Sequence, residues 1–131
     1  MLEDLLKIGF RKVGEIHSVK NRLIIDIVEE AQARNILYSF VINDEPVYVG
    51  KTIQPLKKRM YGYINPGKTQ ATNIRNHNNL KEAIKNNFTV ELYVLPDHGL
   101  LHFGKFHLNL AAGLEDNIVK QLAPRWNMTG K

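Results

Sequence analysis

The chain has 131 residues, of which 44% are hydrophobic and 24% charged, and it carries a net charge of +5; this is the balance of one ordinary globular domain. Cysteine is absent, which excludes disulfide staples and thiolate metal sites. The first residues carry acidic charge and no long apolar run, which predicts neither a signal peptide nor a transmembrane helix. We therefore expect a cytoplasmic protein with a single domain over residues 1–131, no membrane partner and no small-molecule cofactor.

The N-terminal third predicts a short helix followed by a hairpin. Residues Leu2–Ile8 have helical character, with Gly9 as the stop signal. The segments Lys12–Ile16 and Arg22–Ile27 are strand-like and can pair across the turn between them, whereas Val28–Arg34 fits either a helical turn or a continuation. We treat residues 1–34 as an N-terminal extension.

Residues 35–131 predict an α/β (α+β) core. β-branched and aromatic residues make Asn35–Ile42 and Val47–Gly50 an antiparallel hairpin, which brings Tyr38 and Tyr48 onto neighbouring strands. Helical patterns follow over Gln54–Tyr63, Asn73–Asn86 and about Leu110–Leu122, the last with Asn109 as its cap, and a third strand over Phe88–Leu95. The predicted architecture is a small three-stranded antiparallel sheet flanked by helices, to which the N-terminal helix and hairpin are added.

Positive charge is concentrated in one part of the sequence. Between Pro46 and Val90 there are eight basic residues and one acid, Glu82, a net charge of +7. A concentrated positive region is typical of proteins that bind the phosphate backbone of nucleic acids, although a solvated lysine-rich surface has the same composition. The basic residues are Lys51, Lys57, Lys58, Arg59, Lys68, Arg75, Lys81 and Lys85.

A carboxylate interrupts the apolar stripe of the last predicted helix. Glu115 shares one helical face with Ile118, Val119 and Leu122, at spacings of three, four and seven residues. Asp116 and the lysine four residues later fall on an outward face, as an ordinary helix ion pair does. Because a carboxylate near a core costs free energy unless it is paired or binds a cation, Glu115 is a candidate metal ligand. A salt bridge to an arginine, or a head group that reaches water, is the alternative.

Two other motifs do not support a function. Gly50-Lys51-Thr52 matches the end of a P-loop, but that motif needs a glycine where the chain has Glu45. His98, His102 and His107 lie close in sequence, but their spacing fits no common zinc site and cysteine partners are missing.

The pattern of residues resembles the GIY-YIG nuclease family. Ile36-Leu37-Tyr38 and Tyr48-Val49-Gly50-Lys51-Thr52 are similar to the paired signature of that family, with the expected ten-residue interval between the tyrosines. The helix with Arg59 and Tyr63, then Glu115, and finally Pro124-Arg125-Trp126-Asn127 follow in the family's order. The last element resembles the P-x-W-N sequence of the restriction-enzyme-like branch. The chain departs from the signature at Ile36, Leu37 and Val49, which leaves both tyrosines in place.

The resemblance implies a metal-dependent DNA endonuclease. Glu115 would bind one Mg²⁺ or Mn²⁺ ion per active site, Arg59 would stabilise the charge on the scissile phosphate, and Tyr38 or Tyr48 would accept a proton from the attacking water, with Tyr38 preferred. Lys51 would lower the pKa of that tyrosine, and Tyr63 and Asn127 would support the site. The predicted DNA contacts are Lys51, Lys57, Lys58, Lys68 and Arg75.

Two alternatives stay open at the level of sequence. The same fold can serve as a nucleic-acid-binding module without catalysis, or as a nuclease for RNA or branched DNA. Two cuts in duplex DNA would further require either a homodimer or sequential nicking.

Overall fold

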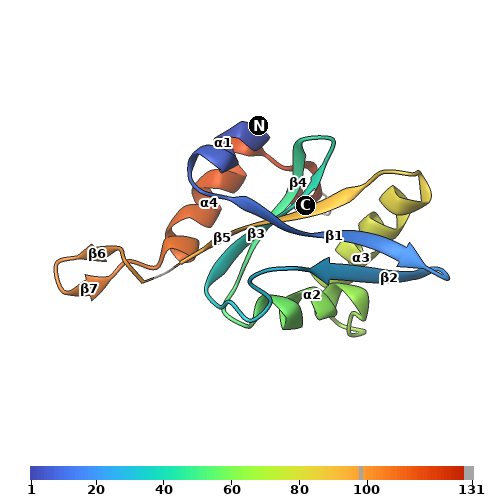
Figure 1. Ribbon diagram of the computed structural model, residues 1–131, viewed down its shortest axis with the longest axis horizontal. Coiled ribbons are helices and arrows are strands. Elements are labelled where there is room, and N and C mark those ends of the chain that lie inside the picture. The colour runs from blue at the N-terminus through green and yellow to red at the C-terminus, as the bar shows by residue number, and fades with distance from the viewer. Residues whose placement is uncertain (98, 129–131) are drawn as a thin grey trace.

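A twisted antiparallel sheet runs through the molecule, with helices on both of its faces (Figure 1). The computed structural model describes residues 1–97 and 99–128. The elements in chain order are α1 (Leu2–Lys7), β1 (Arg11–Val19), β2 (Arg22–Ile27), β3 (Ile36–Ile42), β4 (Glu45–Thr52), α2 (Leu56–Ile64), α3 (Ala71–Lys85), β5 (Val90–Pro96), β6 (His102–Phe103), β7 (Phe106–His107), α4 (Leu110–Leu122) and α5 (Arg125–Met128).

The main sheet has five strands in the order β2-β1-β5-β3-β4, where three were predicted. The predicted core strands β3, β4 and β5 pair as expected, but the N-terminal hairpin continues the same sheet. Strand β1 pairs antiparallel with β5, opposing Gly14 to Leu92 and Ile16 to Val90. Without β1, the backbone groups along the outer edge of β5 would have no hydrogen-bond partners. Strand β1 of the N-terminal hairpin supplies them. Residues 1–34 therefore contribute two strands to the sheet that carries the candidate site.

Strand β3 lies at the centre of the core and is buried along its whole length. Because side chains alternate along a strand, Ile36, Tyr38 and Phe40 face α2 and α3, where they pack in one apolar cluster. Leu37 faces the other way, into a second cluster that contains Val49 of β4 and residues of α1 and α4. The result is a three-layer arrangement in which β3 is covered on both faces.

The helices mostly begin and end where the sequence indicates. The side chain of Asn109 caps α4 by accepting a hydrogen bond of 3.1 Å from the amide of Ala112, as predicted. The small β6–β7 hairpin and the short helix α5 were missed, because elements of two to four residues are too short for a periodic pattern. Of the helices in the described residues, none has the length and apolar character needed to cross a bilayer.

Two glycines offer a test of the hairpin's place in the sheet. A Cβ atom at Gly14 would lie 2.1 Å from the carbonyl oxygen of Asp26 on the paired strand, whereas a Cβ at Gly113 in α4 would meet nothing within 4 Å among the described residues. Gly14→Ala should therefore lower the free energy of unfolding by about 1–3 kcal/mol. Gly113→Ala is the matched control and should raise it by up to about 1 kcal/mol. Chemical denaturation measures both, and equal effects would contradict the pairing of β1 with β2.

Candidate active site

Two tyrosines and an arginine form a hydrogen-bonded chain between the sheet and α2. The hydroxyls of Tyr38 and Tyr63 lie 2.5 Å apart, and Arg59 donates a hydrogen bond of 2.6 Å to the Tyr63 hydroxyl. Arg59 and Tyr63 are four residues apart on α2, so they emerge from the same side of the helix. The ring of Tyr48 lies 6.3 Å from that of Tyr38 and 6.4 Å from that of Tyr63. Four residues that the sequence assigned to the site thus meet in one place.

The guanidinium of Arg59 is held by neutral partners. Besides Tyr63, it donates to the side-chain oxygen of Asn73 at the start of α3, at 2.9 Å, and it lies 4.2 Å from the centre of the Tyr63 ring. Asn73 in turn donates to Gln70, also at 2.9 Å. No carboxylate among the described residues pairs with Arg59. Asn73 had no predicted role, and no sequence signal marks an asparagine as the partner of an arginine fourteen residues away.

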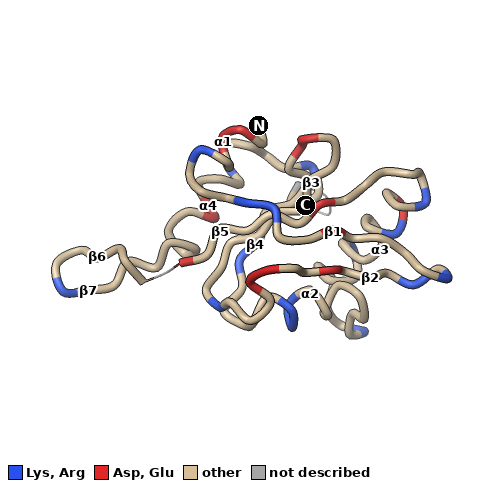
Figure 2. Tube along the Cα trace, viewed as in Figure 1, with Lys and Arg blue, Asp and Glu red and all other residues tan. Residues whose placement is uncertain are grey.

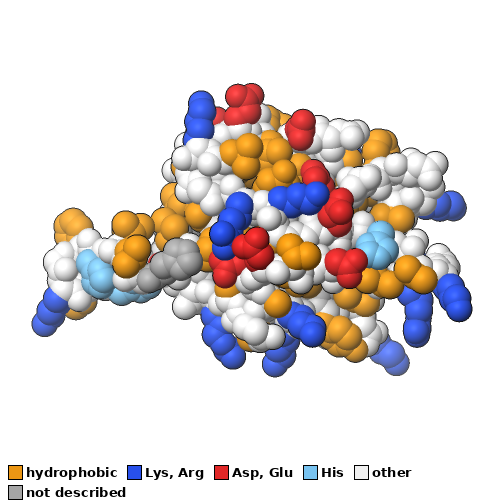
Figure 3. All heavy atoms as spheres, in the orientation of Figure 1, with side chains coloured by type: hydrophobic (Ala, Val, Ile, Leu, Met, Phe, Trp, Pro, Cys, Tyr) orange, Lys and Arg blue, Asp and Glu red, His pale blue; other side chains and the backbone are white. Residues whose placement is uncertain are grey.

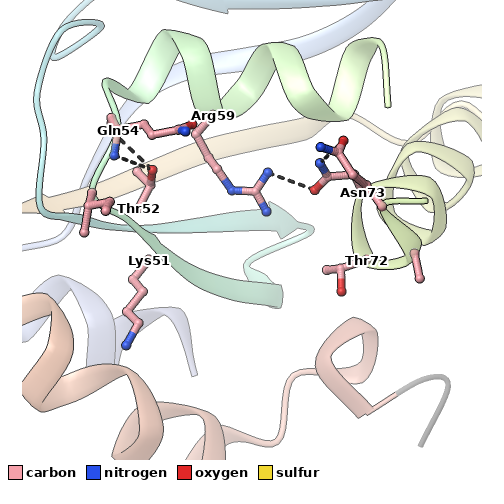
Figure 4. A pocket seen from close by; sticks show the side chains of 9 residues that line it. Lys51, Thr52, Gln54, Arg59, Thr72 and Asn73 are labelled. Carbon is pink, nitrogen blue, oxygen red and sulfur yellow. Dashed lines mark hydrogen bonds between the residues drawn. The ribbon is translucent and has the colours of Figure 1, made fainter. Parts of the chain in front are cut away.

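Arg59 borders an open pocket of about 510 Å³ between the end of β4 and the start of α3. In Figure 4 its side chain reaches from α2 toward Asn73 and Thr72. Thr52 closes the opposite end of the pocket through a local turn with Gln54, in which the backbone amide of Gln54 donates to the Thr52 hydroxyl at 3.0 Å. The wall is polar, and Arg59 contributes a cationic side chain to it, which suits an anionic ligand.

Burial raises the pKa of both hydrogen-bonded tyrosines. The pKa of Tyr38 is raised first by desolvation and then by the neighbouring Tyr48, and Arg59 opposes the shift only partly. The pKa of Tyr63 is raised for the same leading reason. Tyr38 is only 1% exposed, so its hydroxyl has no direct route to an attacking water. The burial of Tyr38 therefore disfavours it as the proton acceptor, whereas Tyr48 is the signature tyrosine that is partly exposed.

Lys51 lies on the other side of the strand from the tyrosines. It is paired with Leu37, whose side chain belongs to the α4 face of the sheet, and Figure 4 shows Lys51 directed toward α4. The expectation that Lys51 lowers the pKa of Tyr38 is therefore wrong, because the pleat places the two side chains on opposite faces.

Gly50 is a packing residue of the tyrosine cluster. It is paired with Tyr38 across the sheet, and a Cβ atom at this position would lie 2.7 Å from the Tyr38 hydroxyl and 2.9 Å from the ring of Tyr48. Only a residue without a side chain lets both rings lie against β4. Gly50 belongs to the signature, but the sequence alone does not indicate this packing role.

Glu115 lies on the face of α4 that packs against the sheet, as its spacing predicted. It is half-buried, between the buried residues Ala111 and Ile118. It forms no ion pair or hydrogen bond with another described residue, whereas Asp116 pairs with Lys120 at 3.1 Å on the exposed side. Helix α4 packs against β4, the strand of Lys51, yet Lys51 and Glu115 do not neutralise each other. A half-buried carboxylate without a protein partner is suited to hold a hard cation that keeps most of its water ligands.

Asn127 binds the edge strand of the sheet through its side chain. The amide of Val49 donates to the Asn127 side-chain oxygen and the Asn127 side-chain nitrogen donates to the Val49 carbonyl, both at 2.9 Å. Trp126 is buried beside it and packs against Phe40, with ring centres 6.3 Å apart. Asn127 thus holds β4 in position, between the tyrosine face and the α4 face.

The predicted DNA contacts lie on the surface around the pocket. Lys57 and Lys58 are exposed on α2, Lys68 on the loop that follows and Arg75 on α3. None of them forms an ion pair with a carboxylate among the described residues. Figure 2 shows basic residues along α2 and α3, with the acidic residues elsewhere for the most part. Their positive charge therefore remains available to a ligand.

The histidines do not form a metal centre in the described part of the chain. His98 lies outside the described residues. His102 and His107 lie edge to face on the β6–β7 hairpin with ring centres 5.8 Å apart, and His107 pairs with Asp97 at 3.2 Å. No group of three or more histidines and acids among the described residues is placed to hold a metal ion.

The raised pKa values of Tyr38 and Tyr63 predict a loss of stability in alkali. In the unfolded chain both phenols ionise near their ordinary pKa of 10.0, whereas in the folded protein they keep their protons to higher pH. Their contribution is complete below pH 10 and is lost as the pH rises above it. Denaturation at a series of pH values should show this decline, and it should be shallower in the double variant Tyr38→Phe/Tyr63→Phe. Tyr61→Phe, at an exposed tyrosine, should keep the parental slope; the same slope in all three proteins would contradict the burial argument.

Neither a protein-family model nor a curated protein matches the chain. Among solved structures, a glutamate-to-alanine mutant of bacteriophage T4 EndoII is similar with a TM-score of 0.75 and 23% sequence identity, over 98% of this chain and 98% of that one. The restriction endonuclease HPY188I in complex with product DNA is similar with a TM-score of 0.55 and 22% identity, over 91% of this chain and 76% of that one. The mixed α/β architecture of this chain is therefore similar to the fold of EndoII over nearly the whole chain.

Proposed function

We propose that the chain is a metal-dependent DNA endonuclease of the GIY-YIG type, which hydrolyses phosphodiester bonds. The observation that carries the proposal is Arg59, a partly buried guanidinium at an open pocket whose described partners are all neutral. A charge in this setting is normally compensated, and a phosphate is the anion that a planar guanidinium binds best. The fold shared with two endonucleases supports the same conclusion.

The proposed roles belong to two groups of side chains, one on each face of β4. Arg59, fixed by Tyr63 and Asn73, has further N–H groups with which to hold the scissile phosphate and stabilise the negative charge of the transition state. Tyr48, which is partly exposed, would take the proton of the attacking water, and Tyr38 and Tyr63 would orient Arg59 rather than react. On the other face, Lys51 contacts the phosphate backbone.

Glu115 is the residue that would hold a divalent cation. Its carboxylate has no partner among the described residues and lies on the face of α4 that packs against the sheet, which fits one Mg²⁺ or Mn²⁺ ion completed by water. Such an ion, when bound, supplies Lewis-acid stabilisation of the leaving oxygen. Lys57, Lys58, Lys68 and Arg75 are proposed to bind the flanking phosphates.

Arg59→Lys tests the guanidinium. Lysine keeps the positive charge but loses the planar donors that bind Tyr63, Asn73 and phosphate. Cleavage of supercoiled plasmid should fall by about 10²–10³-fold, the effect of removing one preorganised transition-state donor. Arg11→Lys is the matched control, since Arg11 is an exposed arginine that pairs with Glu30 at 2.7 Å; it should retain full activity. Undiminished cleavage by Arg59→Lys would show that the active site lies elsewhere.

Glu115→Gln tests the metal ligand. The substitution keeps the size of the side chain and removes its charge, so nicking in Mg²⁺ or Mn²⁺ should be lost, and wild-type activity should stop in EDTA. Asp116→Asn, one residue further and paired with Lys120 on the exposed side, should cleave as the wild type does.

A second outcome would identify a binding module in place of an enzyme. If the wild type cleaves no duplex, single-stranded, branched or RNA substrate with any metal, while a gel shift shows salt-sensitive binding, then the fold is used for binding alone. Cleavage confined to RNA or branched DNA would correct the substrate.

A further inference from the structure

A second open groove lies on the other side of α2 from the Arg59 pocket. It has a volume of about 600 Å³ and lies between the turn that joins β1 to β2 and the helices α2 and α3. Because successive side chains on a helix are rotated by about 100°, Arg59 and Tyr61 point to different sides of α2. The groove shares no lining residue with the Arg59 pocket. Its polar and aromatic lining residues include Lys20, Arg22, Tyr61, Asn65, His77 and Lys81.

The groove is positively charged, and no acid is found among the described residues that line it. Lys20 and Arg22 are exposed at the turn, and Lys81 is half-buried on α3. None of the three forms an ion pair with a carboxylate in the described part of the chain. Figure 3 shows basic side chains at the end of the molecule that carries the β1–β2 turn, with the acidic side chains of this face nearer its middle. The groove therefore suits an anionic ligand.

An exposed aromatic ring distinguishes this groove from an ordinary basic surface. Tyr61 is 59% exposed, and its hydroxyl accepts a hydrogen bond of 3.3 Å from the side chain of Asn65. Ile64 adds apolar surface to the same wall. A ring surrounded by cations is the arrangement on which proteins stack the bases of single-stranded nucleic acids.

We propose that this groove binds an unpaired stretch of the substrate, with one base stacked on Tyr61 and the neighbouring phosphates bound by Lys20 and Arg22. In a duplex the faces of the bases are covered by their neighbours, so only an unpaired base offers its face to a side-chain ring. The volume of the groove lies in the range of about 300–1,000 Å³ that holds one ligand of nucleotide size. A duplex is too wide to enter it.

The position of the groove links it to the candidate active site. His77 on α3 donates a hydrogen bond of 2.7 Å from Nδ1 to the backbone carbonyl of Tyr63, so the helix that carries Arg59 also forms a wall of the groove. A helix with its side chains is about 10–12 Å across, which a nucleic acid strand of a few nucleotides spans. The following consequence rests on the proposed nuclease function. The preferred substrate is a duplex with a gap, flap or branch, whose unpaired nucleotides occupy the groove while the scissile phosphate lies at Arg59.

An acidic polypeptide is the less suitable occupant. It would match the positive charge equally well. The side-chain amides of Asn21 and Asn65, which line the groove together with Tyr61, offer both donors and acceptors. A flat ring with such groups beside it matches a base, which has an apolar face and a polar edge.

Binding in EDTA, where metal-dependent cleavage does not take place, tests the role of the ring. The probe is a fluorescently labelled single-stranded oligothymidylate of about 12 nucleotides, followed by anisotropy. Tyr61→Leu should raise the Kd of this probe by about 5–100-fold, the effect of losing one stacked base, and should leave the Kd of a duplex of the same length unchanged. Tyr61→Phe keeps the ring and should bind as the wild type does. Both variants should keep the wild-type unfolding midpoint, because the side chain is exposed.

The salt dependence of the same binding tests the cations. Lys20→Gln/Arg22→Gln removes two positive charges, so the slope of log Kd against log salt concentration should fall by about 1.4, at about 0.7 for each phosphate contact of a single strand. Lys7→Gln/Lys105→Gln removes two exposed lysines outside the groove. This control should keep the wild-type slope.

Three results would overturn the proposal. Unchanged single-strand binding by Tyr61→Leu shows that no base stacks on the ring. An equal loss of single-strand and duplex binding in that variant assigns the groove to duplex DNA. Displacement of the probe by polyglutamate as effectively as by unlabelled oligothymidylate assigns the groove to acidic polypeptides. Because these measurements involve no cleavage, their failure leaves the Arg59 site untouched, and a chain that cleaves nothing can still bind a single strand through Tyr61.

Discussion

The hydroxyl of Tyr63 is the point at which the sheet, helix α2 and the candidate site are joined. It bonds to Tyr38 at the centre of the sheet on one side and accepts from Arg59 on the other. A buried hydroxyl must find partners, and here its partners fix the direction of a guanidinium that no described carboxylate neutralises. The orientation of α2 on the sheet and the presentation of Arg59 to the pocket therefore depend on the same few contacts. A preorganised cation of this kind needs little rearrangement when an anion arrives.

Much of the fold follows from local residue patterns that can be recognised directly in the sequence. Alternation and β-branched residues located β3, β4 and β5, and helical periodicity with the Asn109 cap located α4. The pairing of β1 with β5 was not predictable from these signals. It depends on long-range contact between strands over seventy residues apart in sequence, and no local propensity encodes which sheet edge a hairpin will join. The count of three strands was wrong for that reason.

The sequence predicted which residues form the candidate site better than it predicted how they are arranged. The sequence interpretation grouped Tyr38, Tyr48, Arg59 and Tyr63, and they do meet. It could not assign Lys51 to the opposite face, because that required the register of β4 against β3. It could not give Tyr38 its buried environment either, since burial depends on how α2 and α5 pack over the sheet. Asn73 and Gly50 were missed because their contributions, a hydrogen bond and an absent side chain, leave no motif.

The contact between Asn127 and Val49 has a consequence for the solubility of the chain. Strand β4 is an outer strand of the sheet, and its outward backbone groups at Val49 are satisfied by a single side-chain amide that stands in for a neighbouring strand. That amide comes from 78 residues further along the chain, so it is placed only after a large loop has closed. Until then β4 offers unpaired donors and acceptors that another chain can add to. At Val49 the asparagine thus occupies backbone groups that another chain could otherwise bind, and it also holds the strand that carries Tyr48 and Lys51.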